Sequence, residues 1–538
     1  MRWRLVAATA ACTVAATLAA CSSSGSNIPL DESASTTIPI TSDDATEPAS
    51  APGDVVEVRI SVDGAGDEIS PLIRGLNGDL DAAQMRDVGI TVNSWGGNPT
   101  TRFNYMIGHA WNAARDYEYR NVNYTESEAD AFRAFVDLNE EAGVASRAVV
   151  PTLGWIAKDD DSAHCSFPDS NGGCQGAPEA ECESPGPIAD PRDTSIESTP
   201  QMVADWIDGV LGEGRDVQFL SMDNEPELWG YTHYDVHPEC TTYEEVLDKY
   251  LTYARALRAV APDAQLMGPV MCCWYDFWGG GPGAADGSTN DFLRWFLENV
   301  RAADEELGQR TLDVVDLHYY PQSDVFNDNV DPETNELRLR STRSLWDPEY
   351  VDESWIDQPI NFLPRVMSTI EEAYPGTPLF ISEWNFGAEE SMNGALVIAD
   401  VLGLFGREGV YAATYWRSPE PGSPGYMAMK MHGNYDGAGT AFEGRTVPVE
   451  LADVTSVSAF AALSESGDVL RIMLINKSPE TAATLSLRLG GHDAAGSSQR
   501  WTYGSESAGA IVTDSVSTVE PFTVPASSIV VLEVPSEP

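Results

Sequence analysis

Short apolar segments alternate with longer segments of helical periodicity from about residue 70 to about residue 420. In one such pair, VQFLSMDNEP is followed by YEEVLDKYLTYARALRAV. Strands that are apolar on both faces and separated by helices are typical of a parallel sheet covered by helices. Eight such units lie between PLIRGLN and AATYW, and eight is the number that closes a barrel. The sequence therefore predicts an α/β fold, a (β/α)8 TIM-type barrel, over residues 71–440.

The sequence pattern changes near Thr446, where helical periodicity gives way to short alternating strands such as DVLRIMLINKS and SSIVVLEV. Several short strands separated by turn residues are typical of a β-sandwich. We therefore expect a smaller C-terminal β-sandwich domain over residues 441–538. An early strand, VVEVRISVDG within residues 55–70, is expected to join it.

The first 21 residues, MRWRLVAATAACTVAATLAAC, have the pattern of a bacterial lipoprotein signal peptide. We expect cleavage before Cys21 and lipidation of that cysteine; an ordinary signal peptide or a membrane anchor helix is the alternative. Residues 22–54 are rich in Ser, Thr, Pro and acidic residues and are predicted to be a disordered tether. The protein is therefore expected at the extracellular face of the cell membrane as a lipoprotein, or secreted.

The chain is strongly acidic, with 84 Asp and Glu against 31 Lys and Arg and a formal net charge of −53. Such a charge repels phosphate backbones and anionic lipid headgroups. We therefore exclude nucleic acid as a partner and expect membrane contact only through the N-terminal lipid anchor. A solvated acidic surface explains the charge without any role in binding.

Six cysteines lie in the main body of the chain, and an even number outside the cytoplasm predicts disulfides. The sequence leaves their pairing open. A zinc site formed by His164 with the first three of these cysteines is the alternative, but their spacing is not that of a familiar zinc motif. The six are Cys165, Cys174, Cys182, Cys240, Cys272 and Cys273.

Polar and aromatic residues follow several predicted barrel strands at their C-terminal ends, where the chemistry of such barrels takes place. Asn224 and Glu225 follow the fourth strand, and Glu383 follows the seventh. The remaining candidates for substrate binding at strand ends are His318, Tyr319 and Tyr320 on the sixth strand, Trp384 on the seventh and Trp416 on the eighth.

Two glutamates facing each other across a barrel mouth are what retaining glycoside hydrolysis requires. One carboxylic acid protonates the leaving oxygen, and one carboxylate attacks the anomeric carbon. Asn224 is expected to donate to the sugar 2-hydroxyl. For either glutamate taken alone, a surface or helix-capping carboxylate is the alternative.

Environment distinguishes the two glutamates, because the acid/base needs a raised pKa whereas the nucleophile must stay ionised. A tyrosine hydroxyl that donates to Glu383 would help it to stay ionised. The sequence does not decide between Tyr319 and Tyr320 for this role.

Aromatic rings bind the axial C–H groups of a pyranose, and five tryptophans lie at or just beyond predicted strand ends. Each is a candidate sugar platform, with barrel core as the alternative. Asn98 and Arg102 are expected to order the loop after the second strand, with direct sugar contact as the alternative. His233 and His237 are expected to brace a loop rather than bind metal. The five tryptophans are Trp95, Trp155, Trp229, Trp384 and Trp416.

Several motifs, in this order along the chain, together resemble glycoside hydrolase family 44. The most specific is the stretch from Asp223 to Pro238. The motifs are GGNPTTRFNY, NAARDYEYRN, GWIAKD, DNEPELWGYTHYDVHP, LMGPV, DLHYYPQ and ISEWNFG.

The resemblance implies a retaining endo-β-1,4-glucanase, active on cellulose-type polymers and xyloglucan and built as a TIM-like barrel with a β-sandwich. It also implies Glu225 as general acid/base, Glu383 as nucleophile and Asn224 as the partner of the 2-hydroxyl. No cofactor is required by this chemistry. Structural calcium occurs in some relatives, but the sequence identifies no metal ligands.

Two other functions stay open. The first is a lipid-anchored glycan-binding protein without catalysis, against which the paired glutamates count. The second keeps the hydrolase chemistry and changes the substrate to β-mannan or mixed-linkage glucan, because loops determine specificity. The preferred polysaccharide, the product length, bound ions and the oligomeric state are not determined by the sequence.

Overall fold

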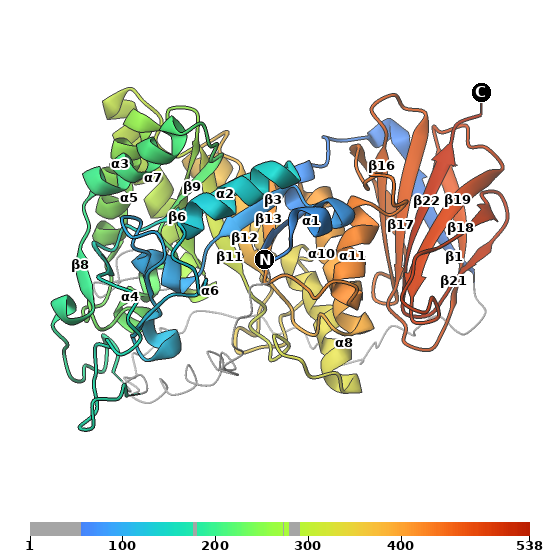
Figure 1. The fold of residues 1–538 in the computed structure, drawn as a ribbon. Helices are drawn as coiled ribbons and strands as arrows, with labels where there is room; N and C mark the ends of the chain where they lie inside the picture. The colour runs from blue at the N-terminus through green and yellow to red at the C-terminus, as the bar shows by residue number, and fades with distance from the viewer. Residues whose placement is uncertain (1–54, 176–179, 273, 279–290, 538) are drawn as a thin grey trace, which may run out of the picture.

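The computed structural model describes residues 55–175, 180–272, 274–278 and 291–537. A barrel surrounded by helices and an all-β domain lie side by side (Figure 1). The predicted signal peptide (1–21), the lipidated Cys21 and the tether (22–54) lie outside the described residues. None of the helices in the described part of the chain is both long and apolar enough to span a membrane.

Eight parallel strands close the barrel in the order in which they occur along the chain. This arrangement confirms the predicted TIM-type fold and places the segment before Asn224 as its fourth strand. The strands are β2 (Gly75–Asn77), β3 (Val92–Trp95), β6 (Ala145–Val150), β9 (Phe219–Met222), β10 (Gln265–Met271), β11 (Val314–Tyr319), β12 (Leu379–Trp384) and β13 (Ala412–Trp416).

Helices surround these strands, and polar caps fix where several of them begin. Asp81 and Gln84 form a reciprocal capping box, and Thr242 accepts a hydrogen bond from the backbone N–H of Glu245. The helices are α1 (Ala82–Val88), α2 (Ala131–Ala142), α3 (Pro200–Gly212), α4 (Trp229–Thr232), α5 (Tyr243–Val260), α6 (Trp274–Trp278), α7 (Phe292–Leu307), α8 (Pro332–Ser341), α9 (Phe362–Ala373), α10 (Met392–Glu408) and α11 (Pro424–Gly433).

The barrel interior is layered along β11, whose alternate residues point inward. Val314 belongs to an apolar layer. Asp316 lies above it and forms a fully buried ion pair with Arg147, the Nη2–Oδ2 distance being 2.9 Å. His318 comes next along the strand, toward the C-terminal mouth. His318, at the mouth of the barrel, therefore lies above a buried ion pair, which in turn lies above an apolar layer.

An irregularity in β12 changes the direction of the side chains at its end. Leu317 pairs with Ile381, but His318 pairs with Glu383, so β12 contains one extra residue at this point. The pairing of β12 with β13 shifts over the same residues. A bulge of this kind redirects the side chains that follow it, and it brings Glu383 beside His318.

The C-terminal domain consists of two facing sheets. The four-stranded sheet has the order β15–β1–β18–β21, and the six-stranded sheet has the order β14–β16–β17–β22–β19–β20. The N-terminal strand β1 pairs in parallel with β18, so it lies in this domain. The strands are β1 (Val55–Ser61), β14 (Arg445–Val447), β15 (Val449–Leu451), β16 (Val457–Leu463), β17 (Val469–Asn476), β18 (Ala483–Gly490), β19 (Ser497–Gly504), β20 (Val512–Ser517), β21 (Phe522–Val524) and β22 (Ser528–Pro535).

Helices α10 and α11 lie between the barrel and the sandwich (Figure 1). Asp400 on α10 and Lys477, just after β17, form a buried ion pair with an Nζ–Oδ2 distance of 2.8 Å. Gly403 packs so closely against Phe460 that a Cβ there would lie 2.4 Å from the ring. The two domains are therefore joined by a buried, closely packed interface.

Candidate active site

Asn224 and Glu225 lie in a tight turn that begins directly after β9. Asp223 and Glu225 both have positive φ values, 70° and 45°, which are uncommon for residues other than glycine. The buried Asp223 carboxylate holds the turn by accepting hydrogen bonds from the backbone N–H groups of Thr152, Leu153 and Asn224. The Glu225 N–H donates to the carbonyl of Val270 at 3.0 Å. These contacts fix the direction in which the Glu225 side chain leaves the strand.

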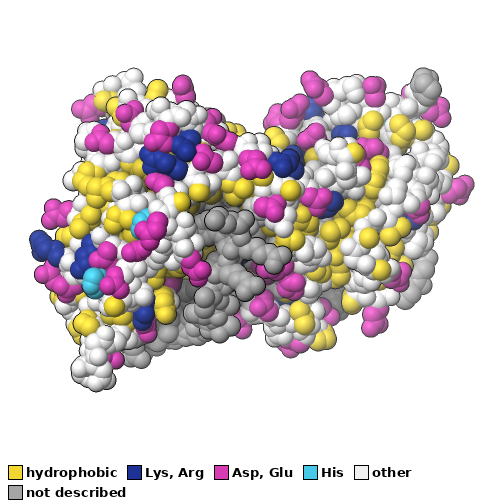
Figure 2. Space-filling model, in the orientation of Figure 1, with side chains coloured by type: hydrophobic (Ala, Val, Ile, Leu, Met, Phe, Trp, Pro, Cys, Tyr) yellow, Lys and Arg dark blue, Asp and Glu magenta, His cyan; other side chains and the backbone are white. Residues whose placement is uncertain are grey.

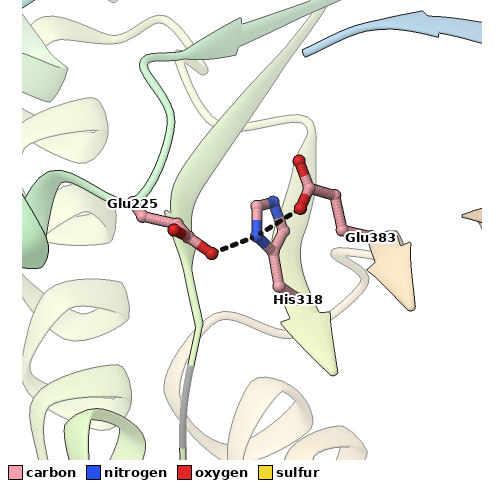
Figure 3. A group of neighbouring side chains, drawn as sticks. All are labelled: Glu225, His318 and Glu383. Atoms are coloured by element: carbon pink, nitrogen blue, oxygen red, sulfur yellow. Dashed lines mark hydrogen bonds and ion pairs between the residues drawn. The ribbon is translucent and has the colours of Figure 1, made fainter. Parts of the chain in front are cut away.

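One carboxylate oxygen of Glu225 and one of Glu383 lie within 4.8 Å of each other, with His318 between them (Figure 3). The His318 Nδ1 is 2.9 Å from Glu225 Oε1 and 3.5 Å from Glu383 Oε2. Sequence reasoning placed His318 among the substrate-binding residues. Its ring is fully buried and lies against both carboxylates, and its predicted contact with sugar stays a prediction.

Charge and burial have opposing effects on the pKa values of Glu383 and His318. Burial raises the pKa of Glu383, the His318 charge works against that rise, and the Glu225 charge adds to it. Burial acts to lower the pKa of His318, but the charge of Glu383 and the hydrogen bond and charge of Glu225 outweigh burial and raise it. The imidazole therefore favours its protonated form between the two acids.

Enclosure opposes the ionised form of Glu383, whose pKa is raised. The Glu383 side chain is only 5% exposed. Nearby donors and His318 are therefore needed to keep Glu383 ionised.

Tyr320 is the tyrosine that donates to Glu383, with an Oη–Oε2 distance of 2.9 Å. Tyr319 points the other way, and its ring packs against Phe362 at a centroid distance of 4.7 Å. Its hydroxyl is buried and has no hydrogen-bond partner among the described residues. Strand alternation turns the Tyr319 side chain away from the two carboxylates, so Tyr320 fills the donor role that the sequence left open, and sugar contact by Tyr319 stays a prediction.

Asn224 and Asn98 are hydrogen-bonded to each other, with Asn224 Nδ2 donating to Asn98 Oδ1 at 3.1 Å. Arg102, four residues after Asn98, forms a fully buried ion pair with Asp235 at 3.0 Å. The loop after the second strand is thus attached to the turn that carries Glu225 and to the segment that follows α4.

Three of the five candidate tryptophans are core residues, which corrects the prediction that they bind sugar. Trp229 and Trp384 are fully buried, and Trp95 lies in a cluster with Phe103, Trp111, Phe132 and Phe135. None of the three has an exposed ring face that could stack on a sugar.

Trp155 and Trp416 are partly exposed, so their proposed stacking role stays a prediction. Sequence reasoning missed Trp355, which is 59% exposed. Its Nε1 donates to Gln322 Oε1 at 3.4 Å, and Gln322 in turn donates to the carbonyl of Tyr320. The signal for it was a tryptophan in the long segment after the sixth strand.

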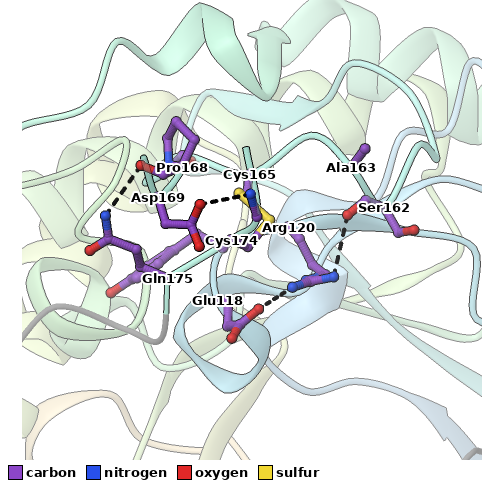
Figure 4. The surroundings of a disulfide bond; sticks show 12 residues. Glu118, Arg120, Ser162, Ala163, Cys165, Pro168, Asp169, Cys174 and Gln175 are labelled. Atoms are coloured by element: carbon purple, nitrogen blue, oxygen red, sulfur yellow. Dashed lines mark hydrogen bonds and ion pairs between the residues drawn. A yellow bond between two sulfur atoms is a disulfide. The ribbon is translucent and has the colours of Figure 1, made fainter. Parts of the chain in front are cut away.

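The loop after the third barrel strand is held by two disulfides, Cys165–Cys174 (Figure 4) and Cys182–Cys240. Two short strand pairs also order this side of the barrel: β4 (Trp111–Asn112) with β5 (Asn121–Val122), and β7 (Trp155–Ala157) with β8 (Ser195–Glu197).

The zinc alternative for these cysteines is wrong, because disulfide sulfurs are not thiolate ligands. His164 instead contacts Asp159 at 2.9 Å. Cys273 lies outside the described residues.

His233 and His237 lie in the segment between α4 and α5. The His237 Nε2 is 3.0 Å from Glu245 Oε1, a contact that braces this segment against α5. His233 is fully buried, and burial holds its pKa well below the usual value. In the part of the chain that the structure describes, the one group of His, Cys, Asp and Glu side chains close enough to share an ion is Glu225, His318 and Glu383.

Acidic side chains are spread over the visible face of both domains (Figure 2). They are not confined to the barrel mouth. This distribution fits a solvated acidic surface better than a binding site for a cationic partner.

Comparisons with known proteins agree with this geometry. The family model described as glycoside hydrolase family 44 matches residues 110–323. CelM2, a bifunctional glucanase-xylanase protein from a metagenome library, has a solved structure that is 30% identical. The alignment covers 90% of this chain and 99% of that chain, with a TM-score of 0.82.

Two curated relatives are similar over most of this chain. Endoglucanase A of Paenibacillus lautus is 28% identical over 480 residues, which are 81% of this chain and 65% of the relative. Beta-mannanase/endoglucanase A of Caldicellulosiruptor saccharolyticus is 27% identical over 465 residues, which are 79% of this chain and 34% of the relative. The chain thus spans less than two thirds of the length of either relative.

Proposed function

Since this chain belongs to glycoside hydrolase family 44, we propose that it is a retaining endo-β-1,4-glucanase that cleaves internal bonds of cellulose-type polymers and xyloglucan. The observation that carries the proposal is the pair of carboxylates within 4.8 Å at the barrel mouth. Retaining enzymes hold their two carboxyl groups about 5 to 5.5 Å apart, whereas inverting enzymes leave roughly 6.5 to 9.5 Å for a water molecule.

In the first step, Glu225 as general acid protonates the glycosidic oxygen while the Glu383 carboxylate attacks the anomeric carbon. The bond to the leaving sugar breaks, and a covalent glycosyl-enzyme forms. In the second step, Glu225 as general base takes a proton from water, which attacks the same carbon and releases Glu383. These two proton transfers and one covalent intermediate need no cofactor.

His318 and Tyr320 stabilise the charges of this cycle. The Tyr320 hydroxyl donates to Glu383 Oε2, so it stabilises the ionised nucleophile. The His318 Nδ1 is within hydrogen-bond distance of Glu225 Oε1, so a proton shared along this contact is available to the general acid. Asn224 is placed beside Glu225 to bind the 2-hydroxyl of the reacting sugar.

Reducing-sugar release by residues 55–538 on carboxymethyl cellulose, xyloglucan and β-mannan tests the activity. We expect release on the first two, and its loss in Glu383→Gln. Azide added to Glu383→Ala should restore partial turnover and give a glycosyl azide of inverted configuration. Full activity in both Glu383→Ala and Glu225→Ala would refute the catalytic assignment.

The same experiment tests two alternative functions. The name of the Caldicellulosiruptor relative includes β-mannanase, so release on β-mannan alone would change the proposed substrate. Binding of polysaccharide without release on any polymer would favour a non-catalytic glycan-binding protein. The paired carboxylates with His318 between them count against that function, because binding does not need them.

We also propose that the enzyme acts outside the cell, attached to the membrane through a lipid on Cys21. The support is the sequence pattern of residues 1–21 followed by the polar stretch 22–54. Labelled fatty acid should be incorporated into the full-length chain and not into Cys21→Ala. Incorporation that is equal in both would contradict the anchor.

A further inference from the structure

Three polar side chains form a line that ends beside the general acid. The Asn98 Nδ2 donates to both oxygens of Asp116, at 3.3 Å and 3.2 Å. The Asn98 Oδ1 accepts from Asn224 Nδ2 at 3.1 Å. Asn224 immediately precedes Glu225 in the chain, so the line runs from a carboxylate, through one amide, to the amide next to the acid/base.

The direction of these hydrogen bonds is set at the Asp116 end. An ionised carboxylate only accepts hydrogen bonds, so it holds the Nδ2 side of the Asn98 amide toward itself. The Oδ1 side of Asn98 then faces Asn224 and accepts from it. With Asn98 reversed, its Oδ1 would face the Asp116 oxygens, and two acceptors would repel each other. The carboxylate therefore determines which way both amides point.

The backbone on either side of this line is held firmly. Gly97 has a φ of 91°, and the Trp416 ring lies so close that a Cβ at this position would be 2.6 Å from its Cη2. The Thr100 N–H and hydroxyl both donate to the Gly97 carbonyl. Arg115, next to Asp116, lies over the Tyr231 ring at 3.9 Å. Asn98 and Asp116 thus have little freedom to move apart.

Asn224 retains unused hydrogen-bonding capacity in this arrangement. One N–H of its side chain is used by Asn98, and its Oδ1 is buried with no hydrogen-bond partner among the described residues. A buried carbonyl oxygen without a donor is costly and calls for a ligand that supplies one. A sugar hydroxyl both donates and accepts, so it can satisfy the oxygen and the remaining N–H together.

Asp116 lies within electrostatic reach of the acid/base. Protein crowding around the carboxyl raises the pKa of Asp116 to about 6, the Asn98 hydrogen bond works against this rise, and the charge of Glu225 adds to it. Asp116 as a whole residue is exposed to solvent. It is therefore not a core residue, yet both of its carboxylate oxygens accept from Asn98.

We propose that Asp116 is a positioning residue, whose carboxylate fixes the Asn98 amide and, through it, the orientation in which Asn224 binds the sugar 2-hydroxyl. This inference rests on the proposed function, in which Asn224 contacts that hydroxyl. The effect of replacing Asp116 should therefore require the sugar 2-hydroxyl. It should also depend on which of residues 116 and 98 accepts hydrogen bonds, and not only on the presence of a negative charge.

Two substrates and three variants test the proposal. The substrates are 2,4-dinitrophenyl β-cellotrioside and its analogue lacking the 2-hydroxyl on the sugar that carries the leaving group. Asp116→Asn replaces a carboxylate that only accepts hydrogen bonds by an amide that both donates and accepts them. We expect kcat/KM to fall about tenfold on the full substrate, the effect of one mispositioned hydrogen bond, and to change little on the 2-deoxy analogue.

Exchanging the two side chains gives the decisive control. In Asn98→Asp/Asp116→Asn, the new carboxylate at position 98 accepts from both residue 116 and Asn224, so the orientation of Asn224 is kept. This double variant should recover most of the loss seen in Asp116→Asn. The single variant Asn98→Asp places two carboxylates side by side and should be less active than the double variant. Such a pattern is a coupling between the two positions rather than a general loss of structure.

The outcomes separate the inference from the function on which it rests. Equal losses on the two substrates, or no recovery in the exchanged variant, would overturn the positioning role and indicate that Asp116 contacts sugar itself or only supports the loop. Absence of turnover by the wild-type protein on polymers and on both aryl glycosides would overturn the proposed function, and this inference with it.

Discussion

His318 Nδ1 lies 2.9 Å from Glu225 Oε1, and its ring is completely buried between Glu225 and Glu383. Two carboxylates this close repel each other unless a cation or a proton lies between them. The imidazole supplies both, and this arrangement leads to the first two predictions.

On the acid side of the pH profile, kcat/KM should fall at a pH above the ordinary pKa of a glutamate. Burial raises the pKa of Glu383, and only its ionised form attacks. As the pH falls through that raised pKa, the carboxylate gains a proton and the nucleophile is lost. The acid limb of kcat/KM should therefore lie above about 4.3, the usual glutamate pKa. A limb at or below that pH would contradict the raised pKa.

Replacing His318 by Ala should move the acid limb to still higher pH. The His318 charge works against the rise in the pKa of Glu383, so its removal lets that pKa rise further. A loss in kcat of about a hundredfold is expected near neutral pH, the size typical of a lost acid–base partner. The pH profile is the critical readout, because a loss of activity with an unchanged acid limb would point to misfolding instead.

Tyr320→Phe should lower kcat/KM by roughly tenfold to a hundredfold, since it removes a hydrogen bond to the charged nucleophile. The acid limb should also move to higher pH, because the Tyr320 hydrogen bond acts to lower the pKa of Glu383. Tyr319→Phe is the matched control in the adjacent position. The Tyr319 hydroxyl has no hydrogen-bond partner among the described residues, so this variant should keep nearly full activity.

Lys477→Met should destabilise the protein by about 3 to 5 kcal/mol, because it leaves the buried Asp400 carboxylate without its cation. Lys477→Met/Asp400→Leu should recover much of this loss by removing the charge as well. Arg301→Met breaks an exposed ion pair with Glu305 and should cost less than about 1 kcal/mol. Denaturant unfolding measures all three, and equal effects of Lys477→Met and Arg301→Met would argue against a buried interdomain ion pair.

Removing the Cys182–Cys240 disulfide should cost more stability than removing Cys165–Cys174. The first closes a segment with a sequence separation of 58 and the second one of 9. Restricting a longer segment removes more entropy from the unfolded chain, and a disulfide contributes about 2 to 4 kcal/mol. Thermal unfolding of the two Cys→Ser double variants gives the comparison, and the reverse order would mean that native-state strain dominates.

Hydrophobic periodicity was enough to predict the barrel. A strand covered by helices on its outer face and by the barrel core on its inner face must be apolar on both, and this pattern depends only on the local sequence. The same reasoning placed Glu225 just beyond the fourth strand and Glu383 at the C-terminal end of the seventh, and in the structure Glu225 follows β9 and Glu383 lies at the end of β12, directly before Trp384. The switch to short alternating strands near Thr446 was equally local.

The roles of aromatic side chains at strand ends could not be predicted in this way. Trp229 lies beyond the fourth barrel strand and Trp416 is the last residue of the eighth, yet Trp229 is fully buried and Trp416 is partly exposed. A large apolar ring suits a core position and a sugar platform equally well, so its type does not reveal its direction. Tyr319 and Tyr320 differ for the same reason.

The sequence by itself determined the barrel, the sandwich and the positions of the two glutamates at strand ends. These follow from the period of apolar residues and from the place of each residue along its strand. Only the tertiary structure decided that the extra residue in β12 brings Glu383 next to His318, and that Asp116 and Asn98 meet beside Asn224. Such contacts join segments far apart in the chain. Their distances depend on register, bulges and loop packing, which involve the whole fold.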